Sequence, residues 1–241
     1  MLIGLYRFGN KLLSKQSLRG QGSWRNRSAT IKICQSQKTA MEFAEGTDRI
    51  IQGYAQGYFL MADEMGVIGW YSSRQRALIP LDERFHYPKS LRRILNQKRF
   101  LVEINRDFLG VCRGCAERET TWISPQLIKI YYNLYQQGWA YSFETWQGNE
   151  LAGGILGIAI RGVFIGESMF YRIPDASKVA MVELVKYLKK KDFVLFDAQL
   201  QNPHLERFGA YKVSDKKYKS LLKKALAKTC IFGDIGQPLI F

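Results

Sequence analysis

The stretch AYSFETWQGNELAGGILGIAIRGVFIGESMF, residues 140–170, decides the fold class. It contains three apolar runs, which are separated by the short polar segments Gln147–Asn149 and Arg161–Gly162. Turn segments of this length and composition between apolar runs predict β-hairpins. We therefore expect three antiparallel strands, at residues 140–146, 150–160 and 162–170.

The next segment changes from strand to helix and back. Asp175 stands where it can cap a helix over 176–190, and Val179, Val182, Leu184, Val185 and Leu188 would form its buried stripe. Phe193-Val-Leu-Phe-Asp197 then reads as a buried strand. The predicted class is α/β (α+β): an antiparallel central sheet followed by a strand–helix–strand unit. Such a topology is compatible with an acetyltransferase-like fold.

The residues before and after this core are also predicted to be ordered. We expect helices at 90–95, 108–116 and 125–137, a helix at 48–56 capped by Thr47, and short helices at 205–209 and 216–227. Strands are expected at 70–71, 77–81 and 100–104, the first two around a turn at 72–75.

Positive charge is concentrated at the two ends of the chain. The formal net charge is +15, and residues 1–41 hold eight Lys or Arg and no acid. Residues 212–241 hold seven basic and two acidic residues, whereas the stretch between holds 21 basic and 19 acidic, an excess of 21 − 19 = +2. The pattern favours a polyanionic partner such as RNA. Solvated basic tails, or an organelle transit peptide at the N-terminus, are the alternatives.

Composition argues against several other classes. No apolar run approaches the roughly 20 residues of a membrane-spanning helix. The four cysteines include Cys112-Arg-Gly-Cys115, a lone CxxC without the second pair or histidines that a structural zinc site needs. We interpret these cysteines as incidental thiols in a reducing compartment.

Two carboxylates lie inside apolar strands. Glu167 interrupts Val163–Phe170, and Asp197 ends Phe193–Asp197. A buried ionised carboxylate needs a partner or has a function, because leaving it unpaired is costly. If regular strand geometry continues past Asp197, Asp197 and Gln199 would lie on the same face of the strand, about 7 Å apart. Glu167 would lie on the same face of its own strand as Ile165 and Met169. The alternative is a carboxylate paired with an arginine for architecture alone.

Aromatic residues gather in segments that read as loops: Tyr54, Tyr58, Phe59, Trp70, Tyr71 and Trp122. Exposed rings of this kind can stack on the bases of single-stranded RNA, although most aromatic residues belong to the core.

The order of several short motifs resembles the leucyl/phenylalanyl-tRNA–protein transferase family, from about Arg49 to Leu226. The matching segments are Tyr54-Ala-Gln-Gly-Tyr-Phe59, Thr121-Trp-Ile123, Gly153-Gly154, Gly166-Glu-Ser-Met-Phe170, Ala176-Ser-Lys178, Asp197-Ala-Gln199, Asn202-Pro-His204 and Gly209-Ala210. As a set they are specific, whereas each alone is weak.

The resemblance implies an enzyme without metal or organic cofactor. Its donor would be a leucyl- or phenylalanyl-tRNA, and its acceptor the α-amino group of a protein that begins with Arg or Lys, which is thereby marked for degradation. We expect a basic, partly disordered arm at 1–40, a small N-terminal domain at 41–85 and an acetyltransferase-like catalytic domain at 86–241. A cytoplasmic monomer with no membrane association is expected.

Carried over by position, the resemblance assigns roles to several residues. Asp197 and Gln199 correspond to the family's proposed catalytic pair, with Glu167 beside them. We expect Asp197 to orient the incoming amine and accept its proton, with the adenosine 2′-hydroxyl as the alternative acceptor and Glu167 holding the network in position. The apolar amino-acid pocket would be lined by Ile155, Phe164, Met181, Leu184 and Phe196, and such a pocket discriminates only softly among Leu, Phe and Met. The terminal adenosine and the tRNA would be held by Tyr54, Trp122, Lys178 and Asn202. Apart from the resemblance, the basic segments with Arg92 and Arg93 and at Lys216–Lys224 are candidates for contact with the tRNA backbone, and solvated faces are the alternative.

The sequence departs from the family pattern at Leu60-Met61, which replaces a proline–tryptophan pair. Two other functions are alternatives. An acyl-CoA-dependent N-acetyltransferase would need a glycine-rich pyrophosphate turn, but Tyr171–Ser177 contains no glycine. A non-catalytic tRNA-binding module would bind charged and uncharged tRNA alike.

Overall fold

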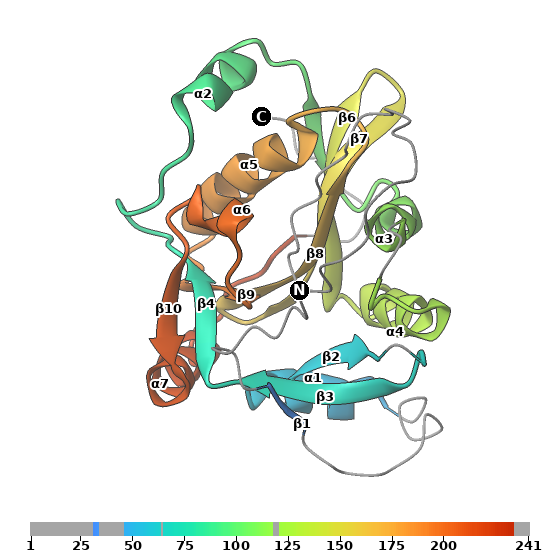
Figure 1. The fold of residues 1–241 in the computed structure, drawn as a ribbon, viewed down its shortest axis with the longest axis vertical. Helices are drawn as coiled ribbons and strands as arrows, with labels where there is room; N and C mark the ends of the chain where they lie inside the picture. The colour runs from blue at the N-terminus through green and yellow to red at the C-terminus, as the bar shows by residue number, and fades with distance from the viewer. Residues whose placement is uncertain (1–30, 34–45, 64, 118–120, 234–241) are drawn as a thin grey trace, which may run out of the picture.

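The computed structural model describes residues 31–33, 46–63, 65–117 and 121–233 (Figure 1). Within these ranges a seven-stranded sheet has the strand order β10-β4-β9-β8-β7-β6-β5. Its central strands are β6 (Ala140–Gln147), β7 (Glu150–Ile160) and β8 (Val163–Tyr171), joined as antiparallel hairpins. The three strands expected from residues 140–170 are thus confirmed.

A strand–helix–strand unit follows these hairpins. Helix α5 (Ala176–Lys190) connects β8 to β9 (Leu195–Gln199), and β8 and β9 are parallel, whereas every other strand pair in the sheet is antiparallel. This mixed sheet with flanking helices confirms the predicted fold class. Gly153 on β7 permits close packing here, because a Cβ on it would lie 2.9 Å from the Cβ of Ala176 at the start of α5.

Both edges of the sheet are formed by shorter strands. One edge carries β4 (Gln75–Ile79) and β10 (Tyr211–Ser214), and the other carries β5 (Leu101–Ile104). Strand β10 and a further strand, β2 (Phe59–Ala62), were not expected from the sequence.

A separate three-stranded sheet has the order β1-β3-β2, with β1 (Ile31–Ile33) and β3 (Ile68–Ser73). Helix α1 (Thr47–Ala55) lies beside it (Figure 1). Strand β4, inside the 41–85 range expected for a small domain, belongs to the large sheet instead. The division at 1–40, 41–85 and 86–241 stays a prediction, and most of the first range lies outside the described residues.

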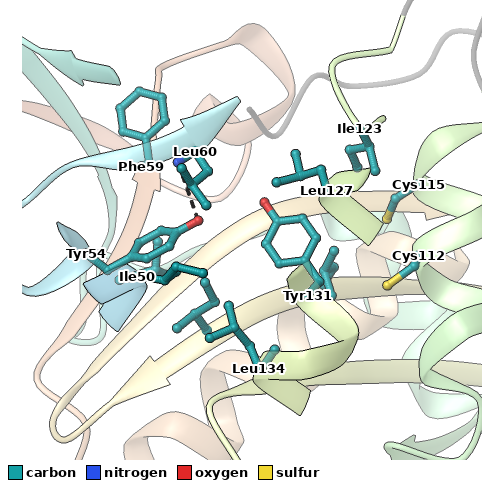
Figure 2. Close-up of a cluster of buried hydrophobic side chains, with 14 of the residues drawn as sticks. Ile50, Tyr54, Phe59, Leu60, Cys112, Cys115, Ile123, Leu127, Tyr131 and Leu134 are labelled. Carbon is teal, nitrogen blue, oxygen red and sulfur yellow. Dashed lines mark hydrogen bonds between the residues drawn. The ribbon is translucent and has the colours of Figure 1, made fainter. Parts of the chain in front are cut away.

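Helices cover both faces of the large sheet (Figure 1). On one face α5 packs with α2 (Lys89–Asn96) and α6 (Pro203–Glu206), over a core that includes Ile155, Phe164 and Phe196. On the other face lie α3 (Phe108–Ala116), α4 (Pro125–Gln136) and α7 (Asp215–Leu226), with Tyr131, Ile165 and Tyr218 in their core. Figure 2 shows part of this second core, where Tyr54 of α1 and Tyr131 of α4 approach one another.

Two expected helix caps differ in detail. The residue before α1 is Gly46 with φ 110°, and Thr47 is its first helical residue, whose hydroxyl accepts a hydrogen bond from Gln137. Asp175 does precede α5, but its side chain makes no cap hydrogen bond and instead binds Lys178. A lysine within reach competes with backbone N–H groups for the same carboxylate.

Candidate active site

The candidate site lies where the pairing of β8 and β9 ends. The two strands are in register from Val163↔Leu195 to Ile165↔Asp197. The β7–β8 register then shifts, with Leu156 opposite Ser168 and Gly157 opposite Gly166, which leaves Glu167 as the extra residue of a β-bulge. Bulges re-aim side chains and often lie next to active sites. Both carboxylates singled out from the sequence therefore meet at this irregularity.

The bulge overturns one expectation about faces. Ile165 and Met169 belong to the cores on opposite sides of the sheet, so Glu167 does not share a face with both. Side chains of a regular strand alternate between the two faces of the sheet. The extra residue of the bulge shifts this alternation by one position, so residues beyond it point to the opposite face.

Asp197 forms a buried, bidentate ion pair with Arg76 of β4. The Arg76 Nε donates to Oδ1 at 2.8 Å and Nη2 donates to Oδ2 at 2.6 Å, and the two side chains are 1% and 0% exposed. Tyr218 of α7 donates to Oδ2 at 2.7 Å, and the backbone N–H of Gln199 donates to Oδ1 at 2.8 Å. These donors occupy most of what one carboxylate can accept. The carboxylate of Asp197 is thus surrounded by donors from β4, α7 and its own strand.

Arg76 is itself enclosed on every side. Its Nη1 donates to the carbonyl of Gly57 at 3.1 Å, and its guanidinium carbon lies 4.7 Å from the Phe59 ring centroid and 4.5 Å from that of Tyr218. Cation–π contacts and a saturated donor set are what a buried guanidinium needs to offset its lost hydration. Arg76 consequently ties the turn before β2 to the carboxylate at the end of β9.

Glu167 accepts hydrogen bonds from a hydroxyl and from a side-chain amide. Tyr131 donates to Oε2 at 2.8 Å, and the Gln199 side-chain amide donates to Oε1 at 3.1 Å. Burial raises the pKa of Glu167, while hydrogen bonds from Tyr131 and Gln199 oppose that rise. Burial also raises the pKa of Tyr131, and the nearby charge of Glu167 adds to the effect.

Gln199 connects the two carboxylates. Its backbone N–H binds Asp197 and its side chain binds Glu167. The residue has φ 61°, so the strand geometry assumed for Asp197 and Gln199 ends at Gln199. A left-handed backbone is unusual for glutamine and costs free energy, which points to a constrained site. Asp197, Gln199 and Glu167 are brought together as one buried network.

The five apolar residues assigned to the amino-acid pocket also lie together. Ile155, Phe164, Met181, Leu184 and Phe196 are all 0% exposed and belong to one core, with Phe164 and Phe196 edge to face at 5.2 Å. Phe196 precedes Asp197 on β9, so the two side chains point to opposite faces. The apolar cluster therefore lies on the face of the sheet opposite to the side chain of Asp197.

Phe232 completes this apolar cluster. Its ring stacks on Phe164 with a centroid distance of 5.0 Å and lies 4.6 Å from the ring of Tyr141. The sequence pattern did not single it out, because it follows the last predicted helix.

The residues expected near the adenosine are partly brought to the site. Tyr54 is 0% exposed and packs edge to face on Trp70, so its ring is not an open stacking surface. Its hydroxyl contributes to the environment of Glu167. Trp122 is 7% exposed, and its indole N–H has no acceptor among the residues that the structure describes. A buried, unsatisfied donor is a candidate ligand contact.

The remaining tRNA candidates are more dispersed. Lys178 binds Asp175 at 2.6 Å, and the Asn202 side chain caps α6 by accepting from Leu205 N at 3.0 Å. Arg92 and Arg93 are exposed on α2, at the end of the molecule away from the small sheet (Figure 1). Tyr58, Phe59, Trp70 and Tyr71 lie in or next to β2 and β3 instead of in loops, and Phe59 is fully buried.

Arg76, Tyr131 and Tyr218 were missed from the sequence. Arg76 could have been found by the same signal as the two carboxylates, because it is a charged residue directly before the apolar residues Ala77–Ile79. Tyr218 belongs to the buried stripe of a lysine-rich helix together with Leu222 and Ala225. For Tyr131, the local sequence indicated only a packing position on the apolar stripe of its helix.

The cysteine pair carries no comparable chemistry. Cys112 and Cys115 are buried thiols of α3, and burial raises the pKa of Cys112 far above its usual range. A thiol of this kind stays protonated and unreactive. Within the described ranges there is no group of residues that could hold a metal ion.

Comparisons with known proteins bear on this site. A family model described as leucyl/phenylalanyl-tRNA protein transferase matches residues 78–223, and a model of the N-terminal domain of that family matches residues 47–74. The leucyl/phenylalanyl-tRNA–protein transferase of Gloeothece citriformis (strain PCC 7424) is 73% identical over 184 residues, which are 76% of this chain and 96% of that protein. The protein of the same name from Herpetosiphon aurantiacus is 46% identical over 183 residues, 76% of this chain and 95% of its own.

Proposed function

The chain belongs to the leucyl/phenylalanyl-tRNA–protein transferase family, and we propose that the network of Asp197, Gln199 and Glu167 is its catalytic site. The enzyme is an aminoacyltransferase, which transfers leucine or phenylalanine from a charged tRNA to a protein. Proteins beginning with Arg or Lys are the proposed acceptors, and methionine is a proposed third donor residue. In the part of the chain described by the structure, no helix is long and apolar enough to cross a membrane. A cytoplasmic monomer is our proposal for location and assembly.

The reaction joins an amine to an activated acyl group. The α-amino nitrogen attacks the ester carbonyl carbon, the ester bond to the ribose oxygen of the terminal adenosine breaks, and the amine proton passes to that oxygen. Because an N-terminal amine has a pKa of about 8, a useful neutral fraction exists at neutral pH. The protein must therefore position the two groups, move one proton and stabilise the developing oxyanion.

Glu167 is the proposed proton acceptor. Burial raises the pKa of its carboxyl, which brings its basicity closer to that of the incoming amine. Asp197 is less suited to that step, because Arg76, Tyr218 and the Gln199 N–H all donate to it. We assign to Asp197 a positioning role, in which the Arg76–Asp197 pair holds the backbone of Gln199 in place. The adenosine 2′-hydroxyl remains an alternative proton shuttle.

Gln199 is the proposed positioning group between the two carboxylates. Its side-chain amide reaches Glu167 while its N–H binds Asp197, so its orientation depends on both. The observation that carries the proposal is this continuous chain of contacts, from Arg76 through Asp197 and Gln199 to Glu167. It lies at the point where β8 and β9 separate.

The apolar cluster around Phe164 and Phe196 is the proposed site for the leucine or phenylalanine side chain. It offers no polar partner to a hydrophilic residue, which would lose its hydration on entry. Lys178, Asn202, Trp122, Arg92 and Arg93 are the proposed tRNA contacts, whereas the fully buried Tyr54 acts through its hydroxyl beside Glu167. Among them, the unsatisfied indole N–H of Trp122 is the best supported.

A transfer assay tests the assignment. The purified protein is incubated with radiolabelled leucyl-tRNA and a peptide beginning with Arg, and the same peptide beginning with Ala serves as the control. Label should reach only the Arg peptide, and acetyl-CoA should not replace the charged tRNA. Transfer to both peptides alike would refute the acceptor proposal.

The catalytic assignment needs variants that preserve shape. Asp197→Asn, Glu167→Gln and Gln199→Leu should each lower kcat by roughly 100-fold or more, as the loss of a positioned acid–base or electrostatic group does. Circular dichroism should show each variant folded. A folded Glu167→Gln enzyme with full activity would exclude Glu167 as the proton acceptor.

A further inference from the structure

Helix α7 presents an unbalanced positive surface. Lys216, Lys217, Lys219, Lys223 and Lys224 are all exposed on the helix, and Lys212 and Lys228 flank it, also exposed. Residues 212–228 hold seven lysines and one acid, Asp215, a net charge of 7 − 1 = +6. We call these seven lysines the α7 lysine face.

An ordinary solvated helix alternates acidic and basic residues and so neutralises itself through i,i+4 pairs. Here only Lys219 has such a pair, with Asp215 at 2.8 Å, among the residues described. Lysines placed this close repel one another, and a bound polyanion removes that repulsion by displacing counterions.

Two grooves border the lysine face where α7 meets the small sheet and α1. One, of about 490 Å³, is lined by Lys219 and Lys223 on α7 and by Ala55 and Gln56 at the end of α1. The other, of about 270 Å³, adds the polar groups of Tyr58, Ser72, Ser73 and Arg74, and its one carboxylate, Asp215, is paired with Lys219. Lysine, arginine, serine, glutamine and tyrosine side chains are the usual donors to nucleic-acid phosphates. The smaller groove thus extends the lysine face with further phosphate donors, and the larger one contributes Lys219 and Lys223.

The opposite side of α7 reaches the candidate active site. Tyr218 points inward and donates to Asp197, while Lys219, the next residue, lines both grooves. Gly57, which lines the smaller groove, accepts the hydrogen bond from Arg76. A ligand on the lysine face would therefore lie one helix away from the reacting carboxylates.

We propose that the α7 lysine face and its two grooves form a docking surface for the sugar–phosphate backbone of the aminoacyl-tRNA. The inference rests on the proposed function, since it takes the ester to react at Glu167 and Asp197. It adds a contact distinct from Arg92 and Arg93, because α2 and α7 lie at opposite ends of the molecule (Figure 1). Contacts of this kind carry no sequence information and serve all accepted tRNAs equally.

Charge reversal with steady-state kinetics tests the docking surface. Lys223→Glu/Lys224→Glu should raise KM for leucyl-tRNA at least about tenfold at low salt and leave kcat within about twofold. It should also reduce the slope of log KM against log salt by about two, one for each phosphate that the variant no longer neutralises. Lys189→Glu/Lys190→Glu, the same charge change at the exposed end of α5, should leave both values unchanged.

A minimal donor separates docking from catalysis. The leucyl ester of adenosine has no tRNA body, so wild type and Lys223→Glu/Lys224→Glu should use it equally well. An unchanged KM for leucyl-tRNA would overturn the docking surface, as would a raised KM for the acceptor peptide instead. If the wild-type enzyme transfers leucine from neither leucyl-tRNA nor the leucyl ester of adenosine, the proposed function itself is wrong. That result differs from an unchanged KM for leucyl-tRNA in the variant, which would contradict the docking surface alone.

Discussion

Arg76 and Asp197 come from adjacent strands, β4 and β9, and form a fully buried bidentate ion pair although they are 121 positions apart in the chain. The pair fixes Oδ1 of Asp197 so that it accepts the backbone N–H of Gln199, which adopts φ 61° and directs its side chain to Glu167. A long-range ion pair thus determines the local geometry of the candidate catalytic residues. Its removal should affect both stability and transfer.

Breaking the ion pair from one side should be costly. Arg76→Met keeps the length and apolar stem of the side chain but leaves Asp197 as an uncompensated buried carboxylate, a change worth roughly 3–5 kcal/mol. We expect the free energy of unfolding, measured by urea denaturation, to fall by about that amount. Arg76→Met/Asp197→Leu should lose much less, because no charge remains unpaired. Equal losses in the single and double variants would show that packing, and not charge, sets the cost.

Glu167 should give transfer and stability opposite dependences on pH. Burial raises the pKa of its carboxyl in the folded protein above the ordinary value of 4.5. The folded state therefore holds the proton to higher pH than the unfolded state does. Stability is lost as pH rises from about 4.5 through the raised pKa, whereas transfer increases over the same limb as the base ionises.

Glu144 provides the matched control for Glu167. It is a second buried carboxylate with a raised pKa, caused chiefly by burial, and its partners Ser142 and Trp146 are not part of the candidate site. Glu144→Gln and Glu167→Gln should both flatten the pH dependence of stability in urea titrations, but only Glu167→Gln should remove the acidic limb of the kcat profile. A Glu144→Gln enzyme that lost the same limb would contradict the assignment.

His204 should contribute a pH dependence of the opposite sign. Burial lowers its pKa to about 4, and the charges of Lys178 and Arg207 add to the shift. Between the unfolded value of 6.5 and about pH 4, the unfolded state binds the proton more readily. Stability should therefore fall as pH drops through this window. His204→Phe should abolish that fall in thermal melts recorded from pH 7 to pH 4, and a variant with an unchanged slope would assign the acid sensitivity elsewhere.

The sequence predicted the central hairpins and the strand–helix–strand unit, because residues 140–197 carry regular apolar patterns and clear turns. It also identified Glu167 and Asp197 as unusual, since their charges interrupt those patterns. The partner of Asp197 could not be read in the same way. Strand β4 appeared to be half of a local pair with β3, whereas it joins β9 in the large sheet, and such long-range pairing leaves no local signal. The bulge at Glu167 and the left-handed Gln199 depend on that tertiary context.

Phe196 should influence which amino acid the enzyme selects. It lies beside Asp197 on β9 and contacts Phe164 edge to face, so within the proposed pocket its ring limits the room for the donor's side chain. Phe196→Leu should enlarge the pocket and raise the ratio of kcat/KM for phenylalanyl-tRNA over leucyl-tRNA by about tenfold, since differences of this size are worth about 1–3 kcal/mol.

Phe193 is the control, because it is also buried, packs edge to face on Phe232 next to the cluster and is absent from the proposed lining. Phe193→Leu removes a similar volume and should lower the melting temperature by a similar amount, yet leave the phenylalanine-to-leucine ratio unchanged. If both variants shift the ratio equally, selection reflects general loosening of the core. If neither does, the donor's side chain binds elsewhere, because a pocket that loses part of its wall cannot keep the same size preference.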